Sequence, residues 1–204
     1  MKKSWFLLIF VWLYKESLAQ TDSTRFPVII SVFNNATRLP GSGTLGFINT
    51  PIHPGLRMGT LLTYRKSKKS DIYESFDVGY YYHHLSQHGF QLYTELGYRY
   101  KLSCGFGLNA QFLLGYMLTK PDLEVFKLDA NGNYVKKPGW RSQLMTGAGV
   151  GFSYPVMRNS AHPVLIFLNY QFFLQMPFVK NYVPMLPNTA IHLGTIFHIN
   201  TNKK

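Results

Sequence analysis

The segment of residues 90–100 restricts what this chain can fold into more than any other. Nearly every second residue in it is apolar or aromatic, and most of the others are polar or glycine. Successive side chains of a β-strand point to opposite faces of the sheet, so the segment has one apolar face and one polar or small face. At least five other segments repeat this pattern. Alternation with a period of two over so much of the chain indicates an all-β protein.

The N-terminus has the features of a cleavable secretory signal. Lys2 and Lys3 precede an apolar run over residues 5–14, and small side chains stand three before and one before the break that follows Ala19. The run is shorter than the roughly 20 apolar residues that a transmembrane helix needs. We therefore expect residues 1–19 to be removed on export and residues 20–204 to form a single domain.

The mature chain is strongly basic, with a net charge of about +10 once the signal is removed. Such a charge can indicate nucleic acid as a partner, but here the basic residues form no helix face and the protein is exported. Phosphate-bearing lipid headgroups are the acidic partner that we expect, and scattered solubilising charge is the alternative. Cys104 is the only cysteine, which excludes an internal disulfide. We expect no metal and no cofactor.

Eight strands account for the alternation. They are predicted over about residues 27–34, 56–65, 72–84, 90–101, 106–118, 141–153, 164–175 and 189–199. The last seven are each about 10 to 13 residues long, which suits a tilted membrane strand. The first strand is placed at residues 28–33 because they are rich in β-branched side chains, with residues 44–49 as the alternative. Taking both would give an odd number, which bacterial single-chain barrels avoid.

The predicted connections fall into two classes that alternate along the chain. Short or fairly short connections are expected at residues 66–71, 102–105 and 155–162. Longer ones are expected at residues 34–55, 119–140 and 176–187, with residues 84–89 as a short exception. Eight strands place all the long loops on one rim, as in outer-membrane barrels. Within the second long loop, residues 123–128 and 134–137 are predicted to pair around an Asn-Gly turn.

The polar face of the strands suits a narrow lumen better than an aqueous surface. It is rich in Gly, Asn and Gln, and an eight-stranded barrel leaves an interior just wide enough for side chains. Its charges have both signs, and we interpret Arg57, Asp77, Glu95 and Arg99 as an ion-pair network in the lumen. Aromatic residues gather near both strand ends, as at membrane interfaces. We therefore predict an eight-stranded antiparallel, up-and-down transmembrane β-barrel, with a soluble periplasmic lipid-binding barrel as an alternative.

The strand pattern, the signal and the last strand, which ends Gly194-Thr-Ile-Phe-His-Ile199, resemble the small eight-stranded outer-membrane barrel proteins of Gram-negative bacteria. The resemblance covers roughly Val28 to Ile199, and short segments such as residues 52–55 and 79–83 look like those of uncharacterised members. It implies an outer-membrane location and contact with outer-membrane lipid and lipopolysaccharide. A terminal aromatic strand is the assembly signal of that family, and here a polar tail follows Phe197.

Some barrels of this kind are lipid A deacylases that use a Ser-His-acid set. His84 and Ser86 match part of that pattern loosely, and Glu95 is the acid that could orient the histidine. The Asn that follows the Ser in that family is Gln87 here, and the pair falls in a tight loop. We therefore predict a non-catalytic structural or accessory component of the cell envelope, with a deacylase-like lipid A hydrolase as the alternative.

Two further groups of residues are candidates for binding. His83, His84 and His88 lie within six residues, but a solvated histidine-rich loop fits them better than a metal site. The long loops contain apolar residues that are candidates for contact with a partner, such as a larger envelope protein complex, or for packing on one another over the barrel. These loop candidates are Phe126, Trp140, Phe178 and Tyr182. We expect an occluded lumen rather than a solute channel.

Overall fold

The computed structural model describes residues 25–37, 39–40, 52–124, 126–129, 131–136, 139–156, 164–178 and 183–200. The predicted signal peptide, the alternative strand at residues 44–49 and the loop candidate Tyr182 lie outside these residues. Within the described ranges, the chain has no helix with the length and apolar character needed to cross a membrane.

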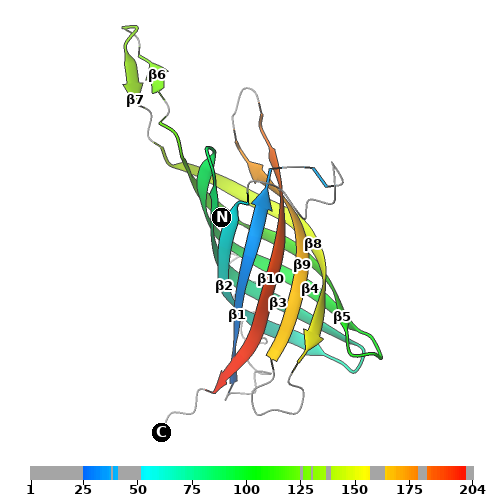
Figure 1. Cartoon of the computed structure of the whole chain (residues 1–204). Helices are drawn as coiled ribbons and strands as arrows, with labels where there is room; N and C mark the ends of the chain where they lie inside the picture. The colour runs from blue at the N-terminus through cyan, green and yellow to red at the C-terminus, as the bar shows by residue number, and fades with distance from the viewer. Residues whose placement is uncertain are drawn as a thin grey trace, which may run out of the picture.

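Eight long antiparallel strands close into one barrel (Figure 1). They are β1 (Arg25–Ala36), β2 (Pro54–Lys66), β3 (Ser70–His83), β4 (Gln87–Lys101), β5 (Gly107–Pro121), β8 (Arg141–Pro155), β9 (Val164–Met176) and β10 (Leu186–Asn200). Each barrel strand pairs with the preceding and following barrel strands, and β1 pairs with β10 to close the wall. The predicted up-and-down barrel is confirmed, including the first strand around residues 28–33, and the strands are somewhat longer than predicted.

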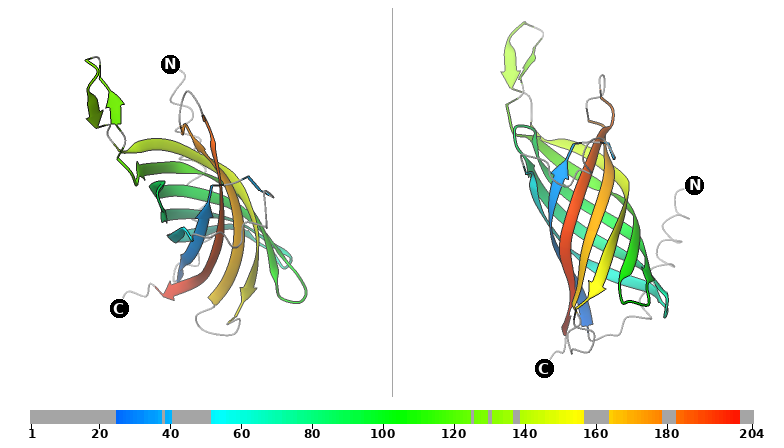
Figure 2. Two further views of the ribbon diagram at one scale, coloured as in Figure 1. Left: turned by 45° about the horizontal axis from the view of Figure 1, so that its top comes forward. Right: turned by 45° about the vertical axis from the view of Figure 1, so that its right-hand side comes forward.

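The two ends of the barrel differ in their connections. The terminal rim, where β1 begins and β10 ends, carries the connections at residues 67–69, 102–106 and 156–163. The loop rim at the other end carries those at residues 37–53, 84–86, 122–140 and 177–185. The predicted separation of short and long connections is therefore confirmed. Two short strands, β6 (Phe126–Leu128) and β7 (Tyr134–Lys136), form the predicted hairpin and project beyond the loop rim (Figures 1 and 2).

The barrel is apolar outside and largely polar inside. On β5, Phe112 and Leu114 point outward with 55% and 52% of their surface exposed, while Gln111 and Leu113, which alternate with them, are 7% and 0% exposed. An apolar outer wall of this size would be costly in water, where each Å² of apolar surface costs roughly 25 cal/mol. Lipid removes that cost, because the wall then meets acyl chains. The distribution is that of a membrane-spanning barrel and the opposite of a soluble barrel with an apolar lining.

Glycines make room for every large aromatic ring in the lumen. All six buried aromatic residues of the described chain face a glycine directly across the neighbouring strand. The pairs are Phe33–Gly55, Tyr73–Gly97, Tyr81–Gly89, Tyr93–Gly115, Phe167–Gly194 and Phe173–Gly147. A Cβ atom on Gly97 would lie 2.2 Å from the Cζ atom of Tyr73, so no larger residue fits beside that ring. These pairs let rings lie flat against the wall of a narrow barrel.

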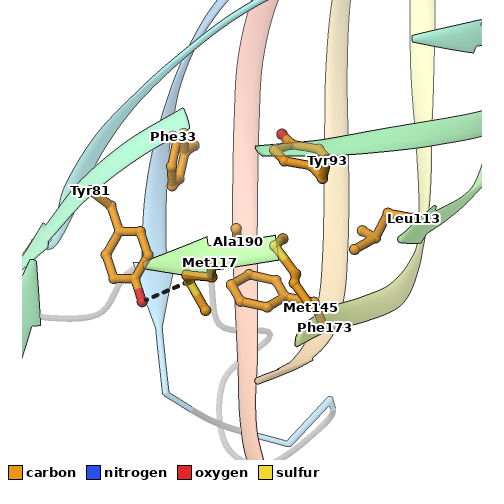
Figure 3. Packing of buried hydrophobic residues seen from close by; sticks show 8 residues of the cluster. All are labelled: Phe33, Tyr81, Tyr93, Leu113, Met117, Met145, Phe173 and Ala190. Carbon is orange, nitrogen blue, oxygen red and sulfur yellow. Dashed lines mark hydrogen bonds between the residues drawn. The ribbon is translucent and has the colours of Figure 1, made fainter. Parts of the chain in front are cut away.

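A hydrophobic cluster occupies the lumen on the loop-rim side of its middle (Figure 3). It consists of Phe33, Tyr81, Tyr93, Leu113, Met117, Met145, Phe173 and Ala190. These residues come from seven of the eight barrel strands and are at most 5% exposed. The Tyr81 hydroxyl donates a hydrogen bond of 3.7 Å to the Met117 sulfur, which satisfies the phenol inside this apolar layer.

Candidate functional site

The turn between β3 and β4 carries His84 and Ser86, the candidates for nucleophilic catalysis. It is held by a hydrogen bond of 3.0 Å from the Ser86 amide to the His83 carbonyl. Leu85, between the two candidates, has a φ of 59°. The Nδ1 atom of His84 lies 3.2 Å from the hydroxyl of Tyr82. The turn therefore directs the imidazole of His84 toward a phenol on β3.

Glu95, the proposed acid of that set, is not near the turn. It lies on β4 eight residues beyond Gln87, which corresponds to about 26 Å along the strand. Its side chain is 1% exposed and faces the lumen. The structure therefore does not bring His84, Ser86 and Glu95 together, and a Ser-His-acid set on these residues cannot form.

A different cluster at the loop rim joins His88 to Asp122. The Nε2 atom of His88 is 3.4 Å from a carboxylate oxygen of Asp122, and its Nδ1 atom is 2.9 Å from the Tyr80 hydroxyl. The Tyr82 hydroxyl and the Leu85 amide donate to the other Asp122 oxygen at 3.1 and 3.0 Å. Both ring nitrogens of His88 are thus occupied, so this histidine has no free nitrogen with which to deprotonate a nucleophile.

The hydrogen bonds in this cluster also set the protonation of the carboxylate. Desolvation raises the pKa of Asp122, but the hydrogen bonds from Tyr82, the Leu85 amide and His88 outweigh it, so the pKa of Asp122 is lowered. The register of the β3–β4 hairpin places Tyr82 opposite His88, and the short turn between the two strands made this pairing predictable. The position of Asp122 beside this turn was not predictable, because Asp122 follows the end of β5 and reaches the β3–β4 turn only through the tertiary fold.

The charged centre of the lumen is built around Arg57. Its Nε and Nη2 atoms are each 2.8 Å from one oxygen of Asp77, and Nη2 is also 2.8 Å from Glu95. The Ser75 hydroxyl donates to Asp77 at 2.5 Å, and the Gln171 side-chain amide donates to Glu95. Arg57 is 2% exposed and has partners on two strands, so its charge is fully compensated inside the barrel.

Arg99, the fourth residue of the predicted network, lies apart from this centre. Its Nη1 atom is 4.0 Å from Asp71, its Nε atom donates to Asn109 at 3.2 Å, and its guanidinium lies over the Tyr73 ring. Lys101 makes a shorter contact of 2.6 Å with the same Asp71 carboxylate. The structure thus divides the predicted network into two groups, and Asp71 and Lys101 belong to the second group although the sequence did not single them out.

A polar layer lies between the hydrophobic cluster and the loop rim. The Gln175 amide donates to Gln143 at 2.7 Å and the Gln87 amide donates to Gln175 at 3.1 Å, while Thr119 donates to Gln143 at 2.8 Å. All four side chains are at most 4% exposed. This layer, the hydrophobic cluster and the Arg57 centre follow one another along the axis, and each consists of side chains closed to water. The described lumen therefore offers no open path for a solute.

The loop candidates are spread over the loop rim. Phe126 belongs to the β6–β7 hairpin and is 52% exposed. Trp140 is 57% exposed and lies 5.9 Å from the ring of Phe90 on the outer wall. Phe178 lies under the guanidinium of Arg141 at 5.8 Å. Phe126 and Trp140 thus remain accessible, whereas Phe178 packs against a neighbour.

His53 and His83 form a close pair at the loop rim. Their rings stack with centroids 3.6 Å apart, and the His53 Nδ1 atom lies 3.1 Å from the carbonyl of Asn35. Burial, followed by the nearby charge of His83, lowers the pKa of His53. No group of three or more metal-binding side chains occurs in the described residues. The pair is a stacked ring contact at the loop rim.

Three solved structures resemble the chain over most of its length. Neisserial surface protein A is 11% identical, with a TM-score of 0.48 and coverage of 88% of this chain and 97% of that chain. Ail, the attachment invasion locus protein of Yersinia pestis, is 11% identical, with a TM-score of 0.45 and coverage of 86% and 99%. The outer membrane enzyme PagL is 9% identical, with a TM-score of 0.45 and coverage of 85% and 99%. No protein-family profile and no curated protein sequence matches this chain.

Proposed function

We propose that this protein is a non-catalytic outer-membrane β-barrel that serves as a structural or accessory component of the cell envelope. The observation that carries the proposal is the closed lumen, in which Arg57 is saturated by Asp77 and Glu95. A transport channel needs an open path, and the deacylase set predicted on His84 and Ser86 needs Glu95 beside the histidine. The described residues offer neither, and what they present to their surroundings is an apolar wall and a loop rim.

In this proposal the terminal rim faces the periplasm and the loop rim faces the cell exterior. Short turns on the periplasmic side and longer loops outside are the arrangement of bacterial outer-membrane barrels. Residues 1–19 are removed on export, and the outer wall contacts outer-membrane lipid and lipopolysaccharide. Phe126 and Trp140, exposed above the barrel, are the side chains that we expect to meet a partner.

The test is extraction of the tagged protein from native membranes in a mild detergent, followed by identification of co-purifying proteins. We expect a stoichiometric envelope partner that is lost with Trp140→Ala but retained with Val150→Ala, a matched change of an exposed residue on the mid-wall. Recovery of the chain in the soluble fraction would contradict the membrane location. Purification of the chain alone would contradict the accessory role.

The rival enzymatic function is tested on the same strain. Lipid A from cells that carry the wild-type protein, the Ser86→Ala variant or no protein is compared by mass spectrometry. We expect identical acylation in all three, because Glu95 lies far from His84 and Ser86, and the nearby carboxylate of Asp122 is occupied by Tyr82, the Leu85 amide and His88. A change in acylation that depends on Ser86 would instead establish a hydrolase.

A further inference from the structure

The lumen widens between the Arg57 centre and the terminal rim. A cavity of about 430 Å³ lies there, and Lys66, Lys101, Pro155 and Val164 at the strand ends are among its lining residues. A much smaller pocket, lined by Arg57 and Glu95, shares Leu61, Arg99 and Ile196 with it. The Arg57 centre therefore marks the inner end of the cavity, and the terminal rim is its mouth. The volume falls in the range of small-molecule sites.

One side of the cavity is apolar. Leu61 on β2, Leu165 on β9 and Ile196 on β10 line it, and they pack against a buried pair formed by Ile29 and Phe167. Outside this cavity, the inward faces of the lumen are filled by glutamines, asparagines and paired charges or by the large rings of the hydrophobic cluster. An apolar wall that borders an unfilled space has no side chain against which to pack, so it suits an acyl chain.

Another part of the cavity wall is cationic. Among the described lining residues, Lys66, Arg99 and Lys101 face the single carboxylate of Asp71. Lys101 contacts that carboxylate at 2.6 Å and Arg99 lies 4.0 Å from it, while Lys66 forms no ion pair with a carboxylate of the described chain. This excess of positive charge contrasts with the Arg57 centre, where the acidic partners compensate the guanidinium fully. Uncompensated cations at the mouth of a low-dielectric cavity attract an anion.

We propose that this cavity binds a single-chain anionic amphiphile of the fatty-acid type. Its carboxylate lies against Lys66, Arg99 and Lys101 at the mouth, and its chain extends along Leu61 and Ile196 toward the Arg57 centre. At about 30 Å³ for a group of the size of a water molecule, the cavity accommodates roughly a dozen non-hydrogen atoms. Decanoate has that size and combines the two chemistries of the wall.

The test is titration of the refolded barrel, in nanodiscs of zwitterionic lipid, with decanoate labelled with ¹³C at its carboxyl carbon. Empty nanodiscs give the background from partition into lipid. We expect saturable binding that weakens at least tenfold in Arg99→Gln/Lys101→Gln and is unchanged in Lys120→Gln, an exposed lysine near the loop rim. Decanol, which lacks the charge, and inorganic phosphate, which lacks the chain, are expected to bind at least tenfold more weakly than decanoate.

A second pair of variants separates ligand binding from folding. Leu165→Trp fills the cavity without changing its charge and is expected to abolish binding, while Lys101→Arg keeps the cation and is expected to bind as the wild type does. Circular dichroism confirms the barrel in each case. Binding to Leu165→Trp with wild-type affinity, equal binding of phosphate and decanoate, or no saturable binding by the wild type would each overturn the proposal.

Discussion

Arg57 on β2 and Glu95 on β4 form an ion pair of 2.8 Å across the strand that separates them. The intervening strand β3 contributes Asp77, which accepts two further hydrogen bonds from the same guanidinium. One cation thus binds three consecutive strands into a unit inside the barrel. Because all three side chains are at most 2% exposed, loss of Arg57 leaves both carboxylates buried without a counter-charge.

Replacement of the central cation is expected to be strongly destabilising. Arg57→Met should lower the free energy of unfolding by about 3–5 kcal/mol, because Asp77 and Glu95 are left buried without a counter-charge. The measurement is guanidinium unfolding of the barrel in phospholipid vesicles. The exposed Arg65→Met serves as the control and should change the free energy by less than about 0.5 kcal/mol.

The same centre allows a rescue experiment. The triple variant Arg57→Met/Asp77→Asn/Glu95→Gln removes every charge and should regain most of the stability lost by Arg57→Met, since no unpaired ion remains. If Arg57→Met alone lowered the free energy of unfolding by less than about 1 kcal/mol, the carboxylates of Asp77 and Glu95 would have to be neutralised in another way.

Glycine opposite Tyr73 is expected to be essential for packing. Gly97→Ala places a Cβ atom 2.2 Å from the Tyr73 ring and should cost about 1–3 kcal/mol on unfolding, because the added methyl group overlaps the ring and forces it to move. Gly79→Ala is the matched control, since its Cβ meets the end of the flexible Gln91 side chain at 2.7 Å. Equal stability losses in the two variants would refute the role assigned to the ring.

Acidification is expected to loosen the contact between His53 and His83. The folded state lowers the pKa of His53, so below the ordinary value of 6.5 the unfolded segment binds a proton more readily than the folded one. The stabilisation from His53 is therefore complete above about pH 6.5 and decreases as the pH falls toward the lowered pKa of the folded state. Exchange of the Asn35 amide, which donates to the His53 carbonyl at 2.9 Å, should speed up from pH 7.5 to 5.5 after correction for intrinsic rates.

The control for this titration is His53→Phe, which keeps a ring in the stack but cannot gain a proton. Its Asn35 amide should show no protonation-dependent change over the same range. Persistence of the pH dependence in that variant would assign the effect to another group.

Asp122 is expected to hold the turn between β3 and β4. Asp122→Asn removes the charge that accepts from Tyr82 and the Leu85 amide, so exchange of the Leu85 amide should accelerate several-fold. The lowered pKa of Asp122 means that the wild-type contacts are complete above the ordinary value of 3.8 and are lost as the pH falls through the lowered one. Asp129→Asn in the β6–β7 hairpin should leave Leu85 unaffected. Unchanged exchange in Asp122→Asn would contradict this assignment.

The alternation of the strands made the barrel predictable, but it could not reveal an inserted residue. β2 and β3 pair regularly from Gly55 to Thr63, and the register then shifts so that Arg65 lies opposite Ile72. This bulge brings Lys66 opposite Asp71. An extra residue shifts the phase of the alternation beyond it, but only Arg65 and Lys66 of β2 follow this bulge, too few for the hydrophobic periodicity to show the shift.

The charged residues show which part of the lumen could be inferred from sequence. Arg57, Asp77 and Glu95 all lie on inward faces, and the alternation predicted that shared face. Arg99 lies four residues beyond Glu95, about 13 Å along the strand, which places it in the group around Asp71. Asp71 was expected in a turn, whereas β3 begins at Ser70 and directs it inward. The cavity was missed for the same reason, because strand ends decide which side chains line it.

The pairing of β1 with β10 has a consequence for how the protein is made. Every other contact in the barrel joins consecutive barrel strands, but this seam joins Arg25 to Asn200 and therefore forms only when the whole chain has been delivered. Until then two strands expose unpaired amide and carbonyl groups, which hydrocarbon cannot satisfy. Insertion and closure must therefore occur together, or an assembly machine must shield both edges. A ribosome-bound or truncated chain that lacks β10 is thus predicted to stay outside the bilayer.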